Sequence, residues 1–214
     1  MQYNIISLGS CCSPAGALRT LQLRNFALPF DWIVSQIDML DKCFEQKFEN
    51  FHKDLHFSTN KRRLIDYYGF EFPHDYPHYN MDIDEFQQTK LINEDQDTTI
   101  TENWQQYYNT VIEKYQRRIQ RFLDIMKDTK PMIVFCRYKT VDVLRLQQVV
   151  KKHFNVHIFI VNSSHESYEN DTIINVNTEK HNIWNDSTVW KKGLDDIIKK
   201  IEMERNIPNK LNKT

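Results

Sequence analysis

Short apolar runs alternate with amphipathic stretches along this chain. Three of the runs are mostly apolar, at residues 3–8, 132–137 and 156–162, and a shorter one covers residues 172–176. Short, mostly apolar runs of this length are typical of strands that are buried on both faces. Because helical patterns separate most of them, the sequence predicts a three-layer α/β fold, with a mostly parallel sheet flanked by helices.

Helix start signals follow the first run. Ser13 is able to cap a helix and Pro14 suits its first position, so a helix is expected from Pro14 to about residue 23. Ser35 and Asp38 have the spacing of a capping box, which predicts a second helix toward residue 48. Further helices are expected at residues 141–153 and 188–204.

Apolar residues also recur at intervals of three or four between residues 104 and 126, which predicts one face of a long amphipathic helix. These residues are Trp104, Tyr108, Val111, Tyr115, Ile119, Phe122 and Met126. Between about residues 48 and 100 the periodicity is lost in aromatic, charged and proline-bearing sequence. This irregular or helical insert is expected to form either a lid with binding loops or short helices that the pattern does not reveal.

Length and composition favour a single α/β domain over residues 1–214, with a flexible tail at 207–214. A hydrophobic fraction of 40% is sufficient for a folded core. The net charge of -1 gives no general attraction to nucleic acid or to anionic membranes. No apolar run approaches the ~20 residues of a membrane span, so the sequence predicts a soluble, cytoplasmic protein without a nucleic acid or membrane partner.

Four cysteines are present, at positions 11, 12, 43 and 136. No pair has the C-x2-C spacing of zinc sites, and the number is too small for a stapling disulfide framework, so a reducing compartment and no metal are expected. Glycine-rich nucleotide-binding motifs are absent from the sequence. Six residues separate Cys12 from Arg19, one more than the C-x5-R loop of cysteine phosphatases contains.

Ligands of open α/β sheets bind beyond the carboxyl ends of the strands. The predicted strands end at Gly9 and Ser10, at Arg137 and at Asn162, and Cys12 lies between the first strand and the first helix. The positive end of a helix lowers the pKa of a cysteine at its start, and its N–H groups are able to stabilise an oxyanion. We therefore expect a reactive thiol at Cys12, with Gly9, Ser10 and Ser13 forming its loop. The alternative is that Cys11 and Cys12 are buried packing residues.

Several motifs carry a resemblance to a known family. They are the opening S-L-G-S-C-C-S-P-A at residues 7–15, P-F-D-W at 29–32, His74-Asp75, R-R-I-Q-R-F at 117–122 and V-F-C-R at 134–137. With these motifs the chain resembles the family described as putative papain-like cysteine peptidases over most of its length. The resemblance places the fixed cysteine at Cys12, with Cys11 at a variable position. The C-G-S-C-W-type surround of true papains is missing, so the thiol is better supported than the peptidase activity.

A fainter similarity links the chain to capsule-sugar acetyltransferases and SGNH-type esterases, which place a nucleophile directly after the first strand. SGNH enzymes have their base near the end of the chain, where this sequence has His181. The aspartate expected three residues earlier is replaced by Thr178. His181 is therefore an alternative base to His74.

The resemblance implies His74 as the base, with Asp75 as the group that orients it. Asp31 is expected to bond to nearby backbone or, as a functional alternative, to support the Cys12 loop and the substrate site. Arg117 and Arg121, together with Arg118, are expected either on a solvated helix edge or as ligands of a phosphate-bearing group. Arg137 and Asn162 complete the predicted substrate-binding residues.

Three functions remain open at this point. The first is a cysteine-nucleophile hydrolase, named by resemblance as a peptidase, which needs no cofactor. The second is an acyltransferase or esterase that acts on a sugar or polysaccharide precursor, with acyl-CoA as co-substrate. The third is a non-catalytic binding module of the same fold. The expected partner is a small molecule, a glycan or a peptide.

Overall fold

The computed structural model describes residues 2–79, 81–83, 89–91, 99–177 and 187–206. These residues divide into two compact units. The first unit contains the described parts of 2–8, 13–25 and 128–206, and the second contains those of 9–12 and 26–127. The expectation of a single domain over residues 1–214 stays a prediction.

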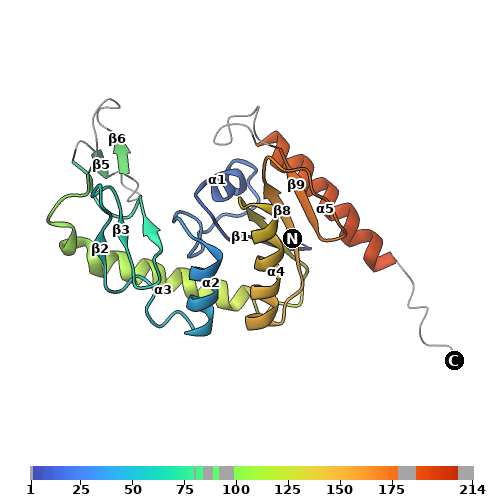
Figure 1. Ribbon diagram of the computed structural model, residues 1–214, viewed down its shortest axis with the longest axis horizontal. Helices are drawn as coiled ribbons and strands as arrows, with labels where there is room; N and C mark the ends of the chain where they lie inside the picture. Colours follow the sequence, from blue (N-terminus) through green and yellow to red (C-terminus); the bar gives the residue numbers. More distant parts are fainter. Residues whose placement is uncertain (1, 80, 84–88, 92–98, 178–186, 207–214) are drawn as a thin grey trace. The chain divides into compact units, whose positions relative to one another are not determined.

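A four-stranded parallel sheet forms the centre of the first unit (Figure 1). Its strands are β1 (Asn4–Ser7), β7 (Met132–Cys136), β8 (Ile158–Ser163) and β9 (Ile173–Val176), in the order β1-β7-β8-β9. All three neighbouring pairs are parallel. The predicted α/β fold with a parallel sheet is confirmed, and each strand lies within two residues of its predicted bounds.

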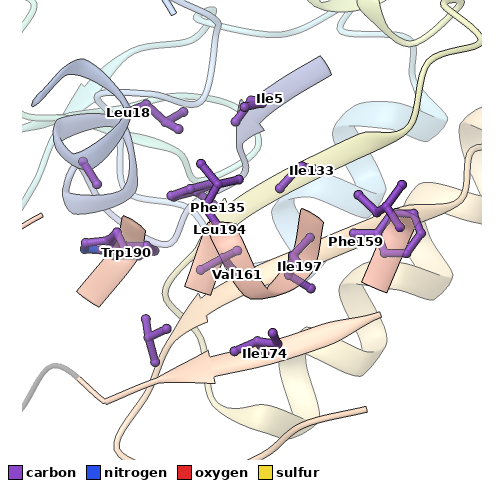
Figure 2. Packing of buried hydrophobic residues seen from close by; sticks show 13 residues of the cluster. Ile5, Leu18, Ile133, Phe135, Phe159, Val161, Ile174, Trp190, Leu194 and Ile197 are labelled. Carbon is purple, nitrogen blue, oxygen red and sulfur yellow. The ribbon is translucent and has the colours of Figure 1, made fainter. Parts of the chain in front are cut away.

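Three helices flank this sheet, α1 (Ser13–Thr20), α4 (Thr140–Phe154) and α5 (Thr188–Asn206). Alternate residues of the strands point to one face, where they pack against α1 and α5 (Figure 2). At the centre of this layer the Trp190 ring of α5 stacks on Phe135 of β7, with ring centroids 5.4 Å apart. Helix α4 connects β7 to β8 and packs against β8. The polar tail predicted at 207–214 lies outside the described residues.

Gly193 allows α5 to approach the sheet closely, and this predicts a measurable effect. A Cβ atom added there would lie 2.7 Å from Cγ1 of both Val161 and Val176. We expect Gly193→Ala to lower the free energy of unfolding by about 1–3 kcal/mol, because overpacking forces these core side chains to move. Urea unfolding followed by circular dichroism measures the change.

Gly16 supplies the matched control, since it also lies in a helix but has no atom within 4 Å of its added Cβ. Gly16→Ala is expected to raise the free energy of unfolding by about 0.5–1 kcal/mol, because alanine restricts the unfolded chain and favours the helix. Equal changes in the free energy of unfolding for the two substitutions would show that a Cβ atom at Gly193 is accommodated without overpacking.

The second unit combines helices with short antiparallel strands. Its helices are α2 (Ile37–Glu45), the 3-10 helix η1 (Trp104–Tyr107) and α3 (Tyr108–Ile125). Its strands are β2 (His56–Phe57), β3 (Leu64–Ile65) and β4 (Glu71–Phe72), which form a sheet in the order β2-β3-β4, and the pair β5 (Met81–Ile83) and β6 (Thr89–Leu91). Among the described residues of 48–100, the short helices expected as one alternative are therefore replaced by short strands. Strands of two or three residues cannot display the period-2 pattern that would identify them.

A cluster of phenylalanine rings forms the core of this unit. Phe30 contacts Phe44, Phe48, Phe51, Phe70 and Phe122 at ring-centroid distances of 5.5–5.9 Å. These rings come from α2, from α3 and from the loops of the predicted insert. Edge-to-face and tilted pairs at these distances add to the stabilisation from buried area. The phenylalanine residues that interrupt the periodicity of the insert thus form part of the core of the second unit.

The start of α2 differs from the prediction. The helix begins at Ile37, and its N-cap is Gln36, which makes no side-chain capping bond. Ser35 instead donates its backbone N–H to the carbonyl oxygen of Ser10 at 2.9 Å. The predicted cap position is therefore off by one residue: the N-cap is Gln36, and the backbone of Ser35 pairs with the cysteine loop. None of the described helices is long and apolar enough to cross a membrane.

Candidate functional site

Cys12 ends a tight loop that leads directly into α1. Gly9 has a φ of 80°, a left-handed conformation that glycine adopts without steric cost. Ser10 is held by the hydrogen bond from Ser35, and Cys12 itself is only 5% exposed. Gly9 and Ser10 thus lie in the loop before Cys12, whereas Ser13 is the first residue of α1. The predicted part of these residues in stabilising an oxyanion stays a prediction.

His74 contacts this cysteine although 62 residues separate them. The Sγ atom of Cys12 lies 3.3 Å from Nε2 of His74, within the distance of a sulfur hydrogen bond. The His74 residue is otherwise exposed. The structure therefore brings together the thiol and the base that the sequence predicted, and leaves part of the imidazole open to solvent.

Two backbone pairings bring His74 to the cysteine loop. Ser35 pairs with Ser10, and the preceding Val34 pairs with Glu71 of β4 through N–H···O bonds of 2.9 and 3.2 Å. His74 follows the end of β4 by two residues. Residues 34 and 35 thus connect the loop of the nucleophile to the strand of the base.

The P-F-D-W motif packs beside this site, and each of its last three residues has a distinct role. Phe30 enters the phenylalanine cluster, and a buried Asp31 accepts the N–H of Leu28 at 2.6 Å. Trp32 lies against His74 edge to face, with ring centroids 6.4 Å apart. The expectation that Asp31 bonds to nearby backbone is confirmed, and its part in substrate binding stays a prediction. Trp32 is half-buried beside the histidine.

The environment of Cys12 changes its pKa in the direction opposite to the one predicted from its place before a helix. The pKa of the thiol is raised to about 12: burial is the largest cause and Cys11 and Asp75 act in the same direction, whereas Arg63 and a backbone hydrogen bond oppose it. The prediction of a lowered pKa is therefore wrong. Loss of solvation opposes the thiolate more strongly than the local positive charge favours it.

His74 is affected in the complementary direction. The surrounding protein atoms desolvate part of its ring and lower its pKa below the ordinary 6.5; Asp75 opposes this shift, and His78 and Arg63 add to it. A raised pKa at Cys12 and a lowered pKa at His74 both favour the uncharged pair at neutral pH. The site therefore holds a thiol beside a neutral imidazole that is able to accept its proton.

Asp75 is directed into the second unit and bonds to α3. Its side chain is 3% exposed; Oδ1 accepts a bond from Lys114 Nζ at 2.5 Å and Oδ2 accepts one from the Tyr115 hydroxyl at 2.7 Å. Burial raises its pKa, but the charges of Lys114 and Arg118 lower it more, with smaller contributions from His52 and from the bond to Lys114, so the net pKa is lowered. Asp75 is thus an ionised carboxylate that acts on His74 through its charge. A direct role in orienting His74 stays a prediction.

His52 extends this buried network. Its ring is fully buried, with Nε2 2.6 Å from the Tyr76 hydroxyl, and it stacks on the Tyr76 ring at a centroid distance of 5.8 Å. The pKa of His52 is lowered to about 4: burial is the largest cause, Asp75 opposes it, and Lys114 adds to it. His52 is therefore neutral at pH 7 and forms part of the scaffold around Asp75. No sequence motif distinguished it from the other histidines.

The arginines of α3 divide between two faces. Arg117 and Arg121 are exposed, whereas Arg118 is half-buried with its guanidinium 5.3 Å from the centroid of the Tyr115 ring. Lys114 and Arg118, four residues apart on one helix face, both act on Asp75. This spacing was visible in the sequence. Phosphate binding by Arg117 or Arg121 stays a prediction.

Asn162 and Arg137 belong to the first unit. Asn162 is fully buried, and its amide makes four bonds: it accepts from the N–H of Tyr138 and the thiol of Cys136, and donates to the carbonyl of Tyr138 and to Asn175. These bonds fill the capacity of an amide, so Asn162 fixes the loop after β7. Arg137 is half-buried in the same loop. Substrate binding by either residue stays a prediction, and His181 lies outside the described residues.

Comparison with known proteins gives one match. The sequence profile of the family described as "Putative papain-like cysteine peptidase (DUF1796)" matches residues 3–166. This range contains both Cys12 and His74. No curated protein and no solved structure matches the chain.

Proposed function

Since the chain belongs to this family, we propose that it is a thiol hydrolase in which Cys12 is the nucleophile and His74 the base. The observation that carries the proposal is the 3.3 Å contact between Cys12 Sγ and His74 Nε2. A nucleophile within hydrogen-bond distance of a neutral base is the arrangement that acyl transfer requires. Family membership supports a hydrolase at this coarse level, and the peptide substrate is part of the proposal.

The reaction follows from the protonation states of the pair. As Cys12 Sγ attacks the carbonyl carbon of the substrate, its proton moves to His74 Nε2, and a tetrahedral oxyanion forms. His74 then returns this proton to the leaving amine, the C–N bond breaks, and the acyl group remains on Cys12 as a thioester. Water attacks the thioester with His74 again as base, which releases the acid and restores the thiol.

This order of events differs from that of a preformed thiolate–imidazolium pair. Because burial raises the pKa of Cys12 and lowers that of His74, deprotonation of the thiol accompanies attack on the substrate. The proposed enzyme therefore uses His74 as a true general base.

The proposal is tested with p-nitrophenyl acetate, an activated ester that reports acyl transfer to any competent thiol. We expect an acetyl adduct whose mass maps to Cys12, retained in Cys11→Ser, and release of more than one equivalent of p-nitrophenolate because water resolves the thioester. An adduct on Cys11 or the absence of any adduct would contradict the proposed nucleophile. Release that stops at one equivalent would contradict hydrolysis.

The other two functions are separated by the same measurement. An adduct that forms from acetyl-CoA would favour the acyltransferase, and a folded protein inert toward both reagents would favour the non-catalytic binding module. Among the described residues, no contact favours either alternative over hydrolysis, so they remain sequence-based predictions.

A further inference from the structure

Arg63 is a cationic residue that strand pairing places next to the segment carrying His74. It directly precedes β3, whose Leu64 pairs with Phe72 of β4, and His74 follows Phe72 by two residues. Its guanidinium forms an ion pair with Glu71, the residue that also pairs with Val34. Arg63 is therefore anchored to the same backbone segments that bring the nucleophile and the base together.

The charge of Arg63 acts on both reacting groups. Its electrostatic effect lowers the pKa of Cys12 and also that of His74. Asp75 has the opposite effect on both groups. The carboxylate of Asp75, however, is 3% exposed and paired with Lys114, whereas the side chain of Arg63 is 42% exposed. Of these two charges, the positive one faces solvent, where a substrate arrives.

The contact with Glu71 orients the guanidinium of Arg63 but leaves some of its N–H donors available. Glu71 bonds to Nη1, and an arginine presents five N–H donors in a planar fork that suits carboxylates. The Glu71 side chain is itself 30% exposed, so the ion pair is partly solvated and screened. Such a pair orients the fork while leaving donors for a second anion.

We propose that Arg63 is a specificity-determining residue that binds a carboxylate on the substrate, so that Cys12 acts on acidic acyl groups. The proposal rests on the proposed function in so far as it takes Cys12 as the reacting atom. It names the substrate class as one with an anionic group close to the scissile carbonyl, as in a peptide with an acidic residue beside the cleaved bond. Arg63 thereby joins Cys12 and His74 as a residue of the site.

The test uses two methanethiosulfonate reagents of similar size, one with an anionic sulfonatoethyl group and one with a cationic trimethylammonioethyl group. Their rates of reaction with Cys12 are compared in a Cys11→Ser background, in which the two other cysteines, Cys43 and Cys136, are fully buried. We expect Arg63→Gln to lower the ratio of anionic to cationic rates at least about fivefold, as the loss of a unit charge near the thiol requires. High salt is expected to shrink the difference.

Matched variants separate this effect from a change in fold. Arg62→Gln removes the same charge from the exposed neighbouring residue and is expected to leave the ratio within twofold. Arg63→Lys is expected to retain most of the preference, and Glu71→Gln is expected to increase it, because one negative charge is lost. Circular dichroism of each variant shows whether the fold is intact.

Each outcome bears on one proposal or on both. A reactive Cys12 whose ratio is the same in Arg63→Gln as in the parent overturns the role of Arg63 alone, as does an equal loss in Arg62→Gln. If the preference for the anionic reagent depends on Arg63 but p-nitrophenyl acetate gives no acyl adduct, only the proposed hydrolase activity is overturned. A folded protein whose Cys12 reacts with neither reagent overturns both.

Discussion

Replacing Lys114 with methionine is expected to lower the free energy of unfolding by about 3–5 kcal/mol at pH 7, because it leaves a buried carboxylate without its cation. The Asp75 side chain is 3% exposed, and the bond from Lys114 Nζ to its Oδ1 is 2.5 Å long. Methionine preserves most of the aliphatic length of lysine but supplies no charge. Urea unfolding followed by circular dichroism measures the loss.

The pH dependence of this loss has a defined sign. In the parent protein the pKa of Asp75 is lowered, since the charges of Lys114 and Arg118 and the bond from Lys114 outweigh the effect of burial. Its contribution to stability is therefore present above the ordinary aspartate pKa of about 4 and disappears as the pH falls through the lower folded value. Without Lys114, burial has the largest effect and raises the pKa of Asp75. As the pH falls, Asp75 is therefore protonated in the variant, and the cost of a buried unpaired charge disappears. The difference between parent and variant is expected to be smaller at pH 5 than at pH 7.

An exposed lysine–aspartate ion pair provides the matched control. Lys191 and Asp195 form an ion pair on α5 with side chains 61% and 49% exposed, and Lys191→Met is expected to cost about 0.5 kcal/mol or less. The double variant Asp75→Asn with Lys114→Met is expected to recover part of the stability lost in Lys114→Met, because no unpaired charge remains. If Lys114→Met costs no more than Lys191→Met, the buried pair does not stabilise the second unit.

The contrast between the two units explains how much of the fold the sequence could predict. Every residue of β7 and β8 is buried, so β7 is apolar throughout and β8 is apolar up to Val161, while α3 repeats its apolar residues with helical spacing. Patterns that extend over five residues or more are therefore readable. The strands β2, β3 and β4 have two residues each, and their pairing depends on contacts between distant segments. No local pattern encodes such contacts.

The candidate site was predictable in its members but not in its environment. Position after the first strand indicated Cys12, and the family resemblance indicated His74, which the structure places 3.3 Å away. Burial is a property of the whole fold, so the raised pKa of Cys12 was not visible from its place before a helix. For the same reason the sequence did not show that Asp75 would bond to Lys114 and Tyr115. Arg63 was missed because it lies outside every recognisable motif.

Replacing His74 with alanine is expected to slow acylation of Cys12 by p-nitrophenyl acetate by a factor of about 10²–10⁴ at pH 7.5, the range that a positioned general base contributes. Because the Cys12 thiol is buried and its pKa is about 12, very little of it is ionised at this pH without a base. The release of p-nitrophenolate under single-turnover conditions measures the rate. His56→Ala removes an exposed histidine of the same unit and is expected to leave the rate unchanged.

The pH profiles of the parent protein and of His74→Ala distinguish a base from a structural residue. In the parent protein the neutral imidazole is the active form, so the rate falls as the pH drops through the pKa of His74, which lies below 6.5, and is level between pH 7 and 8. In His74→Ala the rate depends on the thiolate fraction and is expected to rise about tenfold per pH unit toward the pKa of Cys12. A variant that only loosened the fold would keep the inflection and lower the level. An unchanged rate in His74→Ala would assign the proton to another base, and His181, the second candidate from the sequence, would be the next histidine to replace.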